Sequence, residues 1–325
     1  MWTVLGWVVV GGLAVLAATT LLHISGYAAV AVAQDALIYL LALAWVVLVV
    51  ALVGQSWLVA AAAGVLVAYQ VVLLIPRLVA SRVPRWVREA PRLDLLVTNV
   101  FIDNKTPEAL ARALLARGGD VMVILEWNDG FVRAFDAAGG HDAYPHRLFD
   151  PADTSDYAVG IVSKTPLLEE SEVVTRGPLK LTQAVVDMGG PTLTIVGLNP
   201  TAAVDPGGFE EWEEQLGELI RYVPSLVGPF VIAGDLNTTT YRPKIRELLT
   251  TGLIDAHESL GQGLKPSFKL AADGVLATAP VVRLDHVFLS HDVRAINAED
   301  LASEGSDHLP FVVTLAVRPP NPTHR

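Results

Sequence analysis

The hydrophobic pattern divides the chain into an apolar N-terminal region and a longer region in which strands and helices alternate. Three apolar segments occupy residues 2–22, 36–53 and 57–75. Because a helix of roughly 20 apolar residues is long enough to cross a bilayer, we expect three transmembrane helices within residues 1–76. Asp35 is the only Asp, Glu, Lys or Arg there and precedes the second segment, so we expect a solvated carboxylate at the membrane interface.

From Leu93 onward, short apolar runs with polar turns alternate with amphipathic stretches. This alternation predicts a layered α/β domain over residues 93–317, followed by a disordered tail at 318–325. The expected strands are 93–100, 120–127, 156–164, 181–188, 193–200, 230–237, 281–290 and 309–317. The expected helices are 106–117, 208–223 and 242–250.

Composition agrees with this division. The chain of 325 residues is 52% hydrophobic with a mean hydropathy of +0.45, which is too apolar for a purely soluble protein. After Arg92, 18 basic residues face 32 acidic ones, a net charge of −14. Such a field weighs against a nucleic-acid partner. The chain has no cysteine, so disulfides and thiolate metal ligands are excluded.

An arginine-rich linker joins the two regions at residues 77–92. By the positive-inside rule, this cluster favours a cytoplasmic position for the domain that follows. Alternatively, the linker lies on anionic headgroups at the outer surface. The five arginines are Arg77, Arg82, Arg85, Arg88 and Arg92.

Polar side chains recur where the expected strands end, most clearly in the stretch FVIAGDLNT at residues 230–238. Side chains that end neighbouring strands converge on one edge of a layered fold, so we expect a single site there. The residues concerned are Asn99, Glu126, Asn199, Asp235, Asn237, Asp285, His286, Ser306, Asp307 and His308.

The chemistry of these residues points to a hard metal ion. Carboxylates such as Glu126, Asp235 and Asp307 are the oxygen ligands that Mg²⁺ prefers, and the carboxamides of Asn99 and Asn237 complete such a shell or orient a water molecule. The chain lacks closely spaced histidines, which disfavours a zinc site.

A histidine–carboxylate pair is also available. His308 follows Asp307, and Asp285 lies elsewhere in the sequence as a second candidate partner that fixes the imidazole. For His308 alone, an ordinary surface histidine is the simpler interpretation. The combination with the strand-end residues favours a function in proton transfer.

In their order and separation, these motifs resemble the endonuclease/exonuclease/phosphatase superfamily. They are LVTNV, VILEW, GIVSK, LNP, AGDLN, RLDHVFLS and SDHLPFVVTL, between Leu93 and Val317. The resemblance implies a four-layer α/β sandwich, with two mixed β-sheets face to face and helices outside. It also implies hydrolysis of a phosphoester by in-line attack of water, without a covalent intermediate.

The resemblance further implies a metal site. Mg²⁺ is the expected ion, with Mn²⁺ as the alternative. Glu126 would be the principal ligand, and Asn99 and Asp307 would lie close to the metal.

Catalytic roles follow from the same resemblance. Asp235 would align or deprotonate the attacking water with support from Asn237, and His308, oriented by Asp285, would contact the phosphate or transfer a proton. Many members carry histidine where this chain has Asn199. Because asparagine donates a hydrogen bond but supplies no proton at neutral pH, we assign Asn199 to phosphate binding.

The apolar N-terminus and the acidic domain favour a lipid or lipid-linked phosphate as substrate, at the surface of the lipid bilayer. A membrane-tethered nuclease is the alternative enzyme, and a non-catalytic binding or scaffold protein on the same fold is the third interpretation. Members that resemble this chain in having three spans face outward, so we favour an extracytoplasmic domain over the cytoplasmic one that the linker indicates. The sequence leaves the oligomeric state open.

Overall fold

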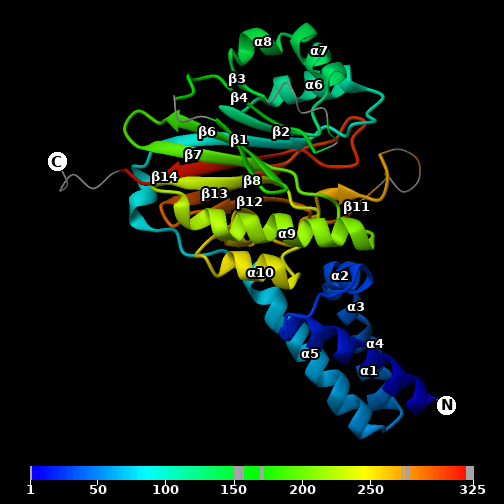
Figure 1. The fold of residues 1–325 in the computed structure, drawn as a ribbon. Helices are drawn as coiled ribbons and strands as arrows, with labels where there is room; N and C mark the ends of the chain where they lie inside the picture. Colours follow the sequence, from blue (N-terminus) through cyan, green and yellow to red (C-terminus); the bar gives the residue numbers. More distant parts are fainter. Residues whose placement is uncertain are drawn as a thin grey trace.

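The computed structural model describes residues 2–149, 155, 157–168, 172–272, 274 and 279–319. Two six-stranded sheets pack face to face, with helices on their outer faces, and the N-terminal helices project from one side of this sandwich (Figure 1). The predicted tail at 318–325 lies mostly outside the described residues.

The first sheet is mixed, because β1 and β2 are parallel and the other neighbours are antiparallel. Its order is β13 (Val293–Asp300), β14 (Phe311–Val317), β1 (Arg92–Asn99), β2 (Val121–Leu125), β4 (Val159–Ser163) and β3 (His146–Leu148).

The second sheet repeats this pattern, with β7 and β8 as the parallel pair. Its order is β5 (Glu172–Arg176), β6 (Leu179–Asp187), β7 (Thr192–Leu198), β8 (Phe230–Asp235), β12 (Asp285–Leu289) and β9 (Ile254–Asp255). A small ribbon pairs β10 (Phe268–Lys269) with β11 (Pro280–Val282).

Helices cover both outer faces. The first sheet carries α6 (Pro107–Arg117), α7 (Asp129–Ala137) and α8 (Gly140–Ala143), and the second carries α9 (Pro206–Tyr222) and α10 (Pro243–Leu249). Short segments are η1 (Arg85–Arg88), η2 (Val223–Ser225) and α11 (Ala256–Ser259). Alternate strand residues form an apolar core between the sheets, as the period of two along a strand requires. The predicted four-layer α/β sandwich is confirmed.

The N-terminal region differs from the prediction of three uninterrupted spans. Among the described residues, two helices are long and apolar enough to cross a membrane, α1 (Trp2–Leu21) and α5 (Trp57–Leu78). The middle segment is broken into α2 (Ala28–Asp35), α3 (Leu37–Leu41) and α4 (Leu43–Val53). A bend of 67° separates Ala28–Asp35 from Leu37–Val53, so they form a third span only if this bent pair is counted as one.

Two charged residues near these helices are not exposed as predicted. Asp35 lies at the bend and pairs with Arg242, with 15% of its side chain exposed. Arg77 lies inside α5 and pairs with Glu258, with 8% of its side chain exposed. Arg77 therefore does not belong to a headgroup-facing cluster, whereas the other four arginines of the linker are exposed.

Several elements differ from the prediction, for example α7, α8, β3 and β5, which were not expected. The edge strand β13 is missed, because its alternating charged residues and its bulge between Ala295 and Asn297 hide the strand pattern. The helix expected at 208–223 begins at Pro206, because the Asp205 side chain caps it by accepting from the amides of Gly207 and Gly208. The strand expected at 281–290 is two strands, β11 and β12.

Candidate active site

The two sheets bring the ends of four strands together at one edge. Asn99 ends β1, Glu126 follows β2, Asn199 follows β7 and Asp235 ends β8. The Asn99 Nδ2 donates to Glu126 Oε1 at 2.7 Å and to Asp235 Oδ2 at 3.3 Å. A single buried amide therefore joins carboxylates that come from opposite sheets.

Glu126 is held from both sides. Its Oε2 accepts from the amide of Ile102 at 2.9 Å, and its backbone has φ +56°, a left-handed conformation that non-glycine residues seldom adopt. Burial raises the pKa of Glu126, and the hydrogen bond from Asn99 opposes that rise. A buried carboxylate with a raised pKa gains stability from a nearby positive charge.

A second group links Asp235, His308 and Asp285. The His308 Nδ1 lies 2.7 Å from Asp285 Oδ2, and its Nε2 lies 3.4 Å from Asp235 Oδ2. Burial opposes a charge on His308, but the two carboxylates raise its pKa to about 10. Burial also raises the pKa of Asp235 to about 7, against the positive charge of His308. The imidazole therefore carries two protons between the carboxylates at neutral pH.

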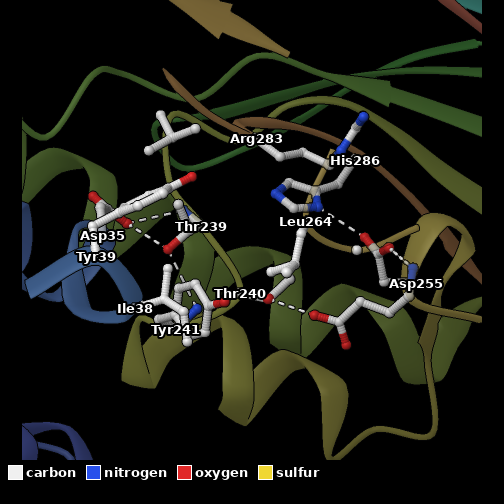
Figure 2. Close-up of a pocket in the computed structure, with 13 residues that line it drawn as sticks. Asp35, Ile38, Tyr39, Thr239, Thr240, Tyr241, Asp255, Leu264, Arg283 and His286 are labelled. Atoms are coloured by element: carbon white, nitrogen blue, oxygen red, sulfur yellow. Dashed lines mark hydrogen bonds and ion pairs between the residues drawn. The ribbon is translucent and has the colours of Figure 1, made fainter. Parts of the chain in front are cut away.

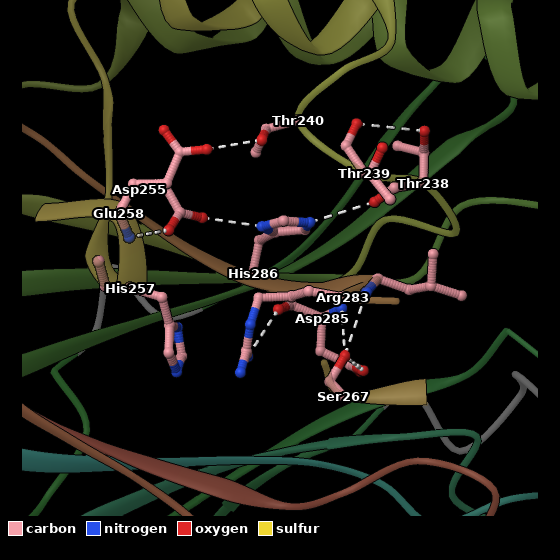
Figure 3. Close-up of polar contacts among 12 residues, drawn as sticks. Thr238, Thr239, Thr240, Asp255, His257, Glu258, Ser267, Arg283, Asp285 and His286 are labelled. Atoms are coloured by element: carbon pink, nitrogen blue, oxygen red, sulfur yellow. Dashed lines mark hydrogen bonds and ion pairs between the residues drawn. The ribbon is translucent and has the colours of Figure 1, made fainter. Parts of the chain in front are cut away.

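Asp285 is itself oriented by a hydroxyl group. Ser267 Oγ donates to Asp285 Oδ2 at 2.6 Å (Figure 3). The ring of Phe268 lies 5.0 Å from that of His308. Neither Ser267 nor Phe268 belongs to a recognisable motif, so neither was predicted. The pairing of Phe268 with His308 in the fold brings both residues to the site.

The turn after β8 fixes Asn237. Its amide donates to Asp235 Oδ1 at 2.8 Å, and its Nδ2 donates to the carbonyl of Pro200 at 2.8 Å. The backbone at Asn237 has φ +53°, and the neighbouring Leu236 carbonyl accepts from the indole of the buried Trp212 on α9 at 2.9 Å. Neighbouring elements thus over-determine a left-handed turn beside Asp235.

Several polar atoms at this edge are buried and have no hydrogen-bond partner. They are both side-chain atoms of Asn199, Oδ1 of Asp285 and Oδ1 of Asp307. Only 6% of Asn199 is exposed. Since buried polar atoms are almost always paired, these atoms fit contacts with a ligand.

The donor set fits a divalent cation. Four carboxylates, those of Glu126, Asp235, Asp285 and Asp307, outnumber the nearby cations His308 and Lys269, which leaves an excess of acidic groups. Among the described residues, Asp235, Asp285 and His308 each have a potential ligand atom within 4.8 Å of the others. Because an imidazolium has no free lone pair, the carboxylates and not His308 are the candidate ligands at neutral pH.

The predicted metal group of Glu126, Asn99 and Asp307 adjoins this cluster. Asn99 turns its amide nitrogen to the carboxylates, and its oxygen accepts from the amide of Phe101 at 2.9 Å. Burial raises the pKa of Asp307, and the charge of His308 opposes that rise.

A cleft of about 740 Å³ opens beside Asp307. Apolar Phe101 and Leu270 and the charged Lys105 are among its lining residues. Its size is that of a small-molecule site, and Asp307 is the carboxylate of the candidate site that lines it.

The fold is shared with solved structures. The structure of D. rerio TDP2 complexed with single strand DNA product has a TM-score of 0.57 at 19% identity, covering 70% of this chain and 99% of that one. An endonuclease/exonuclease/phosphatase from Beutenbergia cavernae has a TM-score of 0.56 at 18% identity, covering 70% and 72%. One from Bacteroides vulgatus has a TM-score of 0.55 at 14% identity, covering 70% and 99%. At these identities the likeness concerns the fold alone.

A comparison with curated proteins finds no match. The sequence model of the Endonuclease/Exonuclease/phosphatase family, however, matches residues 96–308, which is more than half of the chain. The matched range contains β2, β7 and β8, the last four residues of β1 and every site residue from Asn99 to His308. The chain therefore belongs to the Endonuclease/Exonuclease/phosphatase family of metal-dependent phosphoester hydrolases.

Proposed function

We propose that this protein is a membrane-anchored phosphoesterase that uses Mg²⁺, with Mn²⁺ as the alternative ion, to hydrolyse a phosphoester by in-line attack of water. The observation that carries the proposal is the Asp235–His308–Asp285 chain beside the unpartnered buried amide of Asn199. Together these groups supply a proton acceptor, a cation and a hydrogen-bond donor at one sheet edge.

The metal is proposed to lie with Glu126 and Asp307 as ligands and Asn99 beside them. When bound, such an ion lowers the pKa of a ligated water and neutralises phosphoryl charge. Asn99 keeps the Glu126 carboxylate beside Asp235, and the unpartnered Oδ1 of Asp307 is available as a ligand.

The remaining residues would position water and phosphate. Asp235, with a pKa near neutrality, suits a general base that aligns and deprotonates the attacking water, and Asn237 supports it. The imidazolium of His308 stabilises charge on the phosphoryl oxygens and supplies the proton that Asn199 lacks. Asp285 holds the ring of His308, and Asn199 donates to a phosphate oxygen.

A lipid or lipid-linked phosphoester is the proposed substrate. The turn that contains Asn237 continues into Thr238 and Thr239, whose hydroxyls contact Asp35 at the end of the apolar α2. The site therefore lies close to the helices that we propose are embedded in the membrane. Apolar Phe101 and Leu270 in the cleft suit a substrate with an apolar part.

The orientation that we propose is an extracytoplasmic catalytic domain, as in the three-span members that the chain resembles. The exposed linker arginines would then contact outer headgroups. Reporters fused to the C-terminus test this: an alkaline phosphatase fusion should be active, and a fusion active only in the cytoplasm would reverse the orientation.

The function is tested with detergent-purified protein, Mg²⁺, a panel of lipid phosphates and a DNA duplex. Wild type is compared with Asp235→Ala and with Glu210→Ala, an exposed acidic residue on α9, as the control. Release of phosphate or headgroup from a lipid, abolished only by Asp235→Ala, is expected. Cleavage of DNA alone would instead favour the membrane-tethered nuclease. If the folded protein hydrolyses none of these substrates, a binding role would be favoured.

A further inference from the structure

A single carboxylate from the N-terminal helices holds the segment that follows the active-site turn. Asp35 Oδ1 accepts from Thr238 Oγ1 at 2.8 Å and from the amide and hydroxyl of Thr239 at 2.9 and 3.1 Å. Asp35 Oδ2 accepts from the Nε and Nη2 of Arg242 at 2.9 and 2.5 Å. We call residues 238–242 the clamp segment.

The clamp segment begins directly after the left-handed Asn237. On the side of α9, Trp212 holds the Leu236 carbonyl, and Asn237 donates to the Pro200 carbonyl. The two residues that follow donate to Asp35. A left-handed asparagine persists only where its surroundings fix it. Asp35 therefore supplies part of the constraint that keeps Asn237, and with it Asp235, in place.

The clamp segment is also tied to the strand that carries Asp285. The His286 Nε2 lies 3.1 Å from the Thr238 carbonyl, and its Nδ1 lies 2.8 Å from Asp255 Oδ2 (Figure 3). Both partners are acceptors, so both ring nitrogens donate. A displacement of Thr238 would therefore also move His286 and the strand β12, on which Asp285 orients His308.

A second helix also contacts the clamp segment, at its middle residues. Arg77 in α5 donates to Thr240 Oγ1 at 2.8 Å, pairs with Glu258 at 3.1 Å and stacks 4.2 Å over the ring of Tyr241. Both α2 and α5 therefore end on the same five residues of the catalytic domain.

The cavity beside Asp35 has no room for a substrate. Figure 2 shows the cavity between α3, the clamp segment and β12, and its volume is about 30 Å³. A cavity of this size admits water but not a phosphoester. The contacts of Asp35 therefore hold protein to protein, and they do not form a ligand site.

We propose that Asp35 is a positioning residue for the hydrolytic reaction: through the clamp segment, the N-terminal helices fix Asp235 and Asn237 in their active arrangement. This inference rests on the proposed function. It implies that a change in how α2 packs against the catalytic domain changes turnover, although Asp35 touches neither substrate nor metal.

The test compares Asp35→Ala and the near-isosteric Asp35→Asn with Gln34→Ala in the full chain purified in detergent. Gln34 is the matched control because it is fully buried next to Asp35, but its amide bonds to Ile24 and Thr19 inside the helical region. Turnover is measured on the substrate found for wild type, and hydrogen exchange is measured for peptides spanning residues 235–242.

For Asp35→Ala we expect kcat to fall on the order of 10- to 100-fold, as for a misplaced catalytic group, with KM little changed. The Thr239 amide should exchange faster, because its acceptor is lost. The kcat of Asp35→Asn should lie between those of wild type and Asp35→Ala, since the remaining side-chain oxygen of the asparagine can still accept from Thr239. Gln34→Ala should lower thermal stability yet keep kcat and the exchange of residues 235–242.

Wild-type kcat in Asp35→Ala, or an equal loss of kcat in Gln34→Ala, would overturn the inference. Failure of the proposed function can be distinguished from failure of this inference, because the wild type would then hydrolyse none of the substrates. In that case the exchange data decide: unchanged exchange at Thr239 in Asp35→Ala overturns the clamp, and faster exchange confined to residues 235–242 supports it.

Discussion

Gly234 lies where the parallel strands β7 and β8 leave no space for a side chain. It stands opposite Leu198 in the register, one residue before Asp235, and Leu198 itself precedes Asn199. A Cβ atom built on Gly234 would lie 1.8 Å from the Leu198 carbonyl oxygen and 2.9 Å from its carbonyl carbon. Gly234→Ala therefore forces two central strands apart, because the obstructing atoms belong to the backbone.

The magnitude follows from this geometry. Overpacking a core costs about 1–3 kcal/mol, and a clash with backbone in a sheet centre should reach the upper end, about 3 kcal/mol. Each kcal/mol shifts Tm by about 2–4 °C in a domain of this size, so Tm should fall by about 6–12 °C. Because the strands carry Asp235 and Asn199, kcat should also fall, on the order of 100-fold.

Thermal unfolding in detergent, followed by circular dichroism, measures the effect. Gly190→Ala is the neutral control, since nothing lies within 4 Å of its Cβ position. Gly197→Ala should be intermediate, because its Cβ would meet the side chains of Val159 and Val123 at 2.8 and 3.2 Å, and side chains can move. A Tm for Gly234→Ala within about 2 °C of wild type would refute the reasoning.

Three further predictions concern the site and its support. Excess EDTA should abolish hydrolysis, and Mg²⁺ should raise the Tm of wild type but not of Glu126→Gln in a thermal-shift assay; full activity in EDTA would contradict a metal-dependent reaction. His308→Ala should lower kcat by about 10²- to 10⁴-fold with an unchanged circular dichroism spectrum, whereas a loss below tenfold would argue against its proton-transfer role. Burial opposes a charge on His286, but Asp255 raises the pKa of His286. The stability that the charged His286 gives to the fold is therefore fully present below about pH 6.5 and is lost as the pH rises through the raised pKa. Despite burial, His286 lowers the pKa of Asp255 to about 2, so that contribution is present above about pH 4. The destabilisation by His286→Gln, from urea unfolding, should therefore be larger at pH 5 than at pH 10, and a gap that grows with pH would exclude this pairing.

The sequence by itself determined the layered domain and the residues at its catalytic edge. Buried strands require apolar runs, and the polar turns that end them are local features, so stretches such as FVIAGDLNT identify both a strand and the side chains at its end. The order of these motifs was also sufficient to identify the family, which the match over residues 96–308 confirms.

The tertiary structure alone decided which partners these side chains have. Asp35 reads as an interfacial carboxylate, yet it bonds to Arg242, 207 positions away, and Arg77 reads as part of a surface cluster but is buried against Glu258. Ser267 reaches Asp285 only because the chain between them folds back on itself. Periodicity reports which face of an element is buried, but the partner of a buried charge depends on packing between distant segments, which local sequence does not encode.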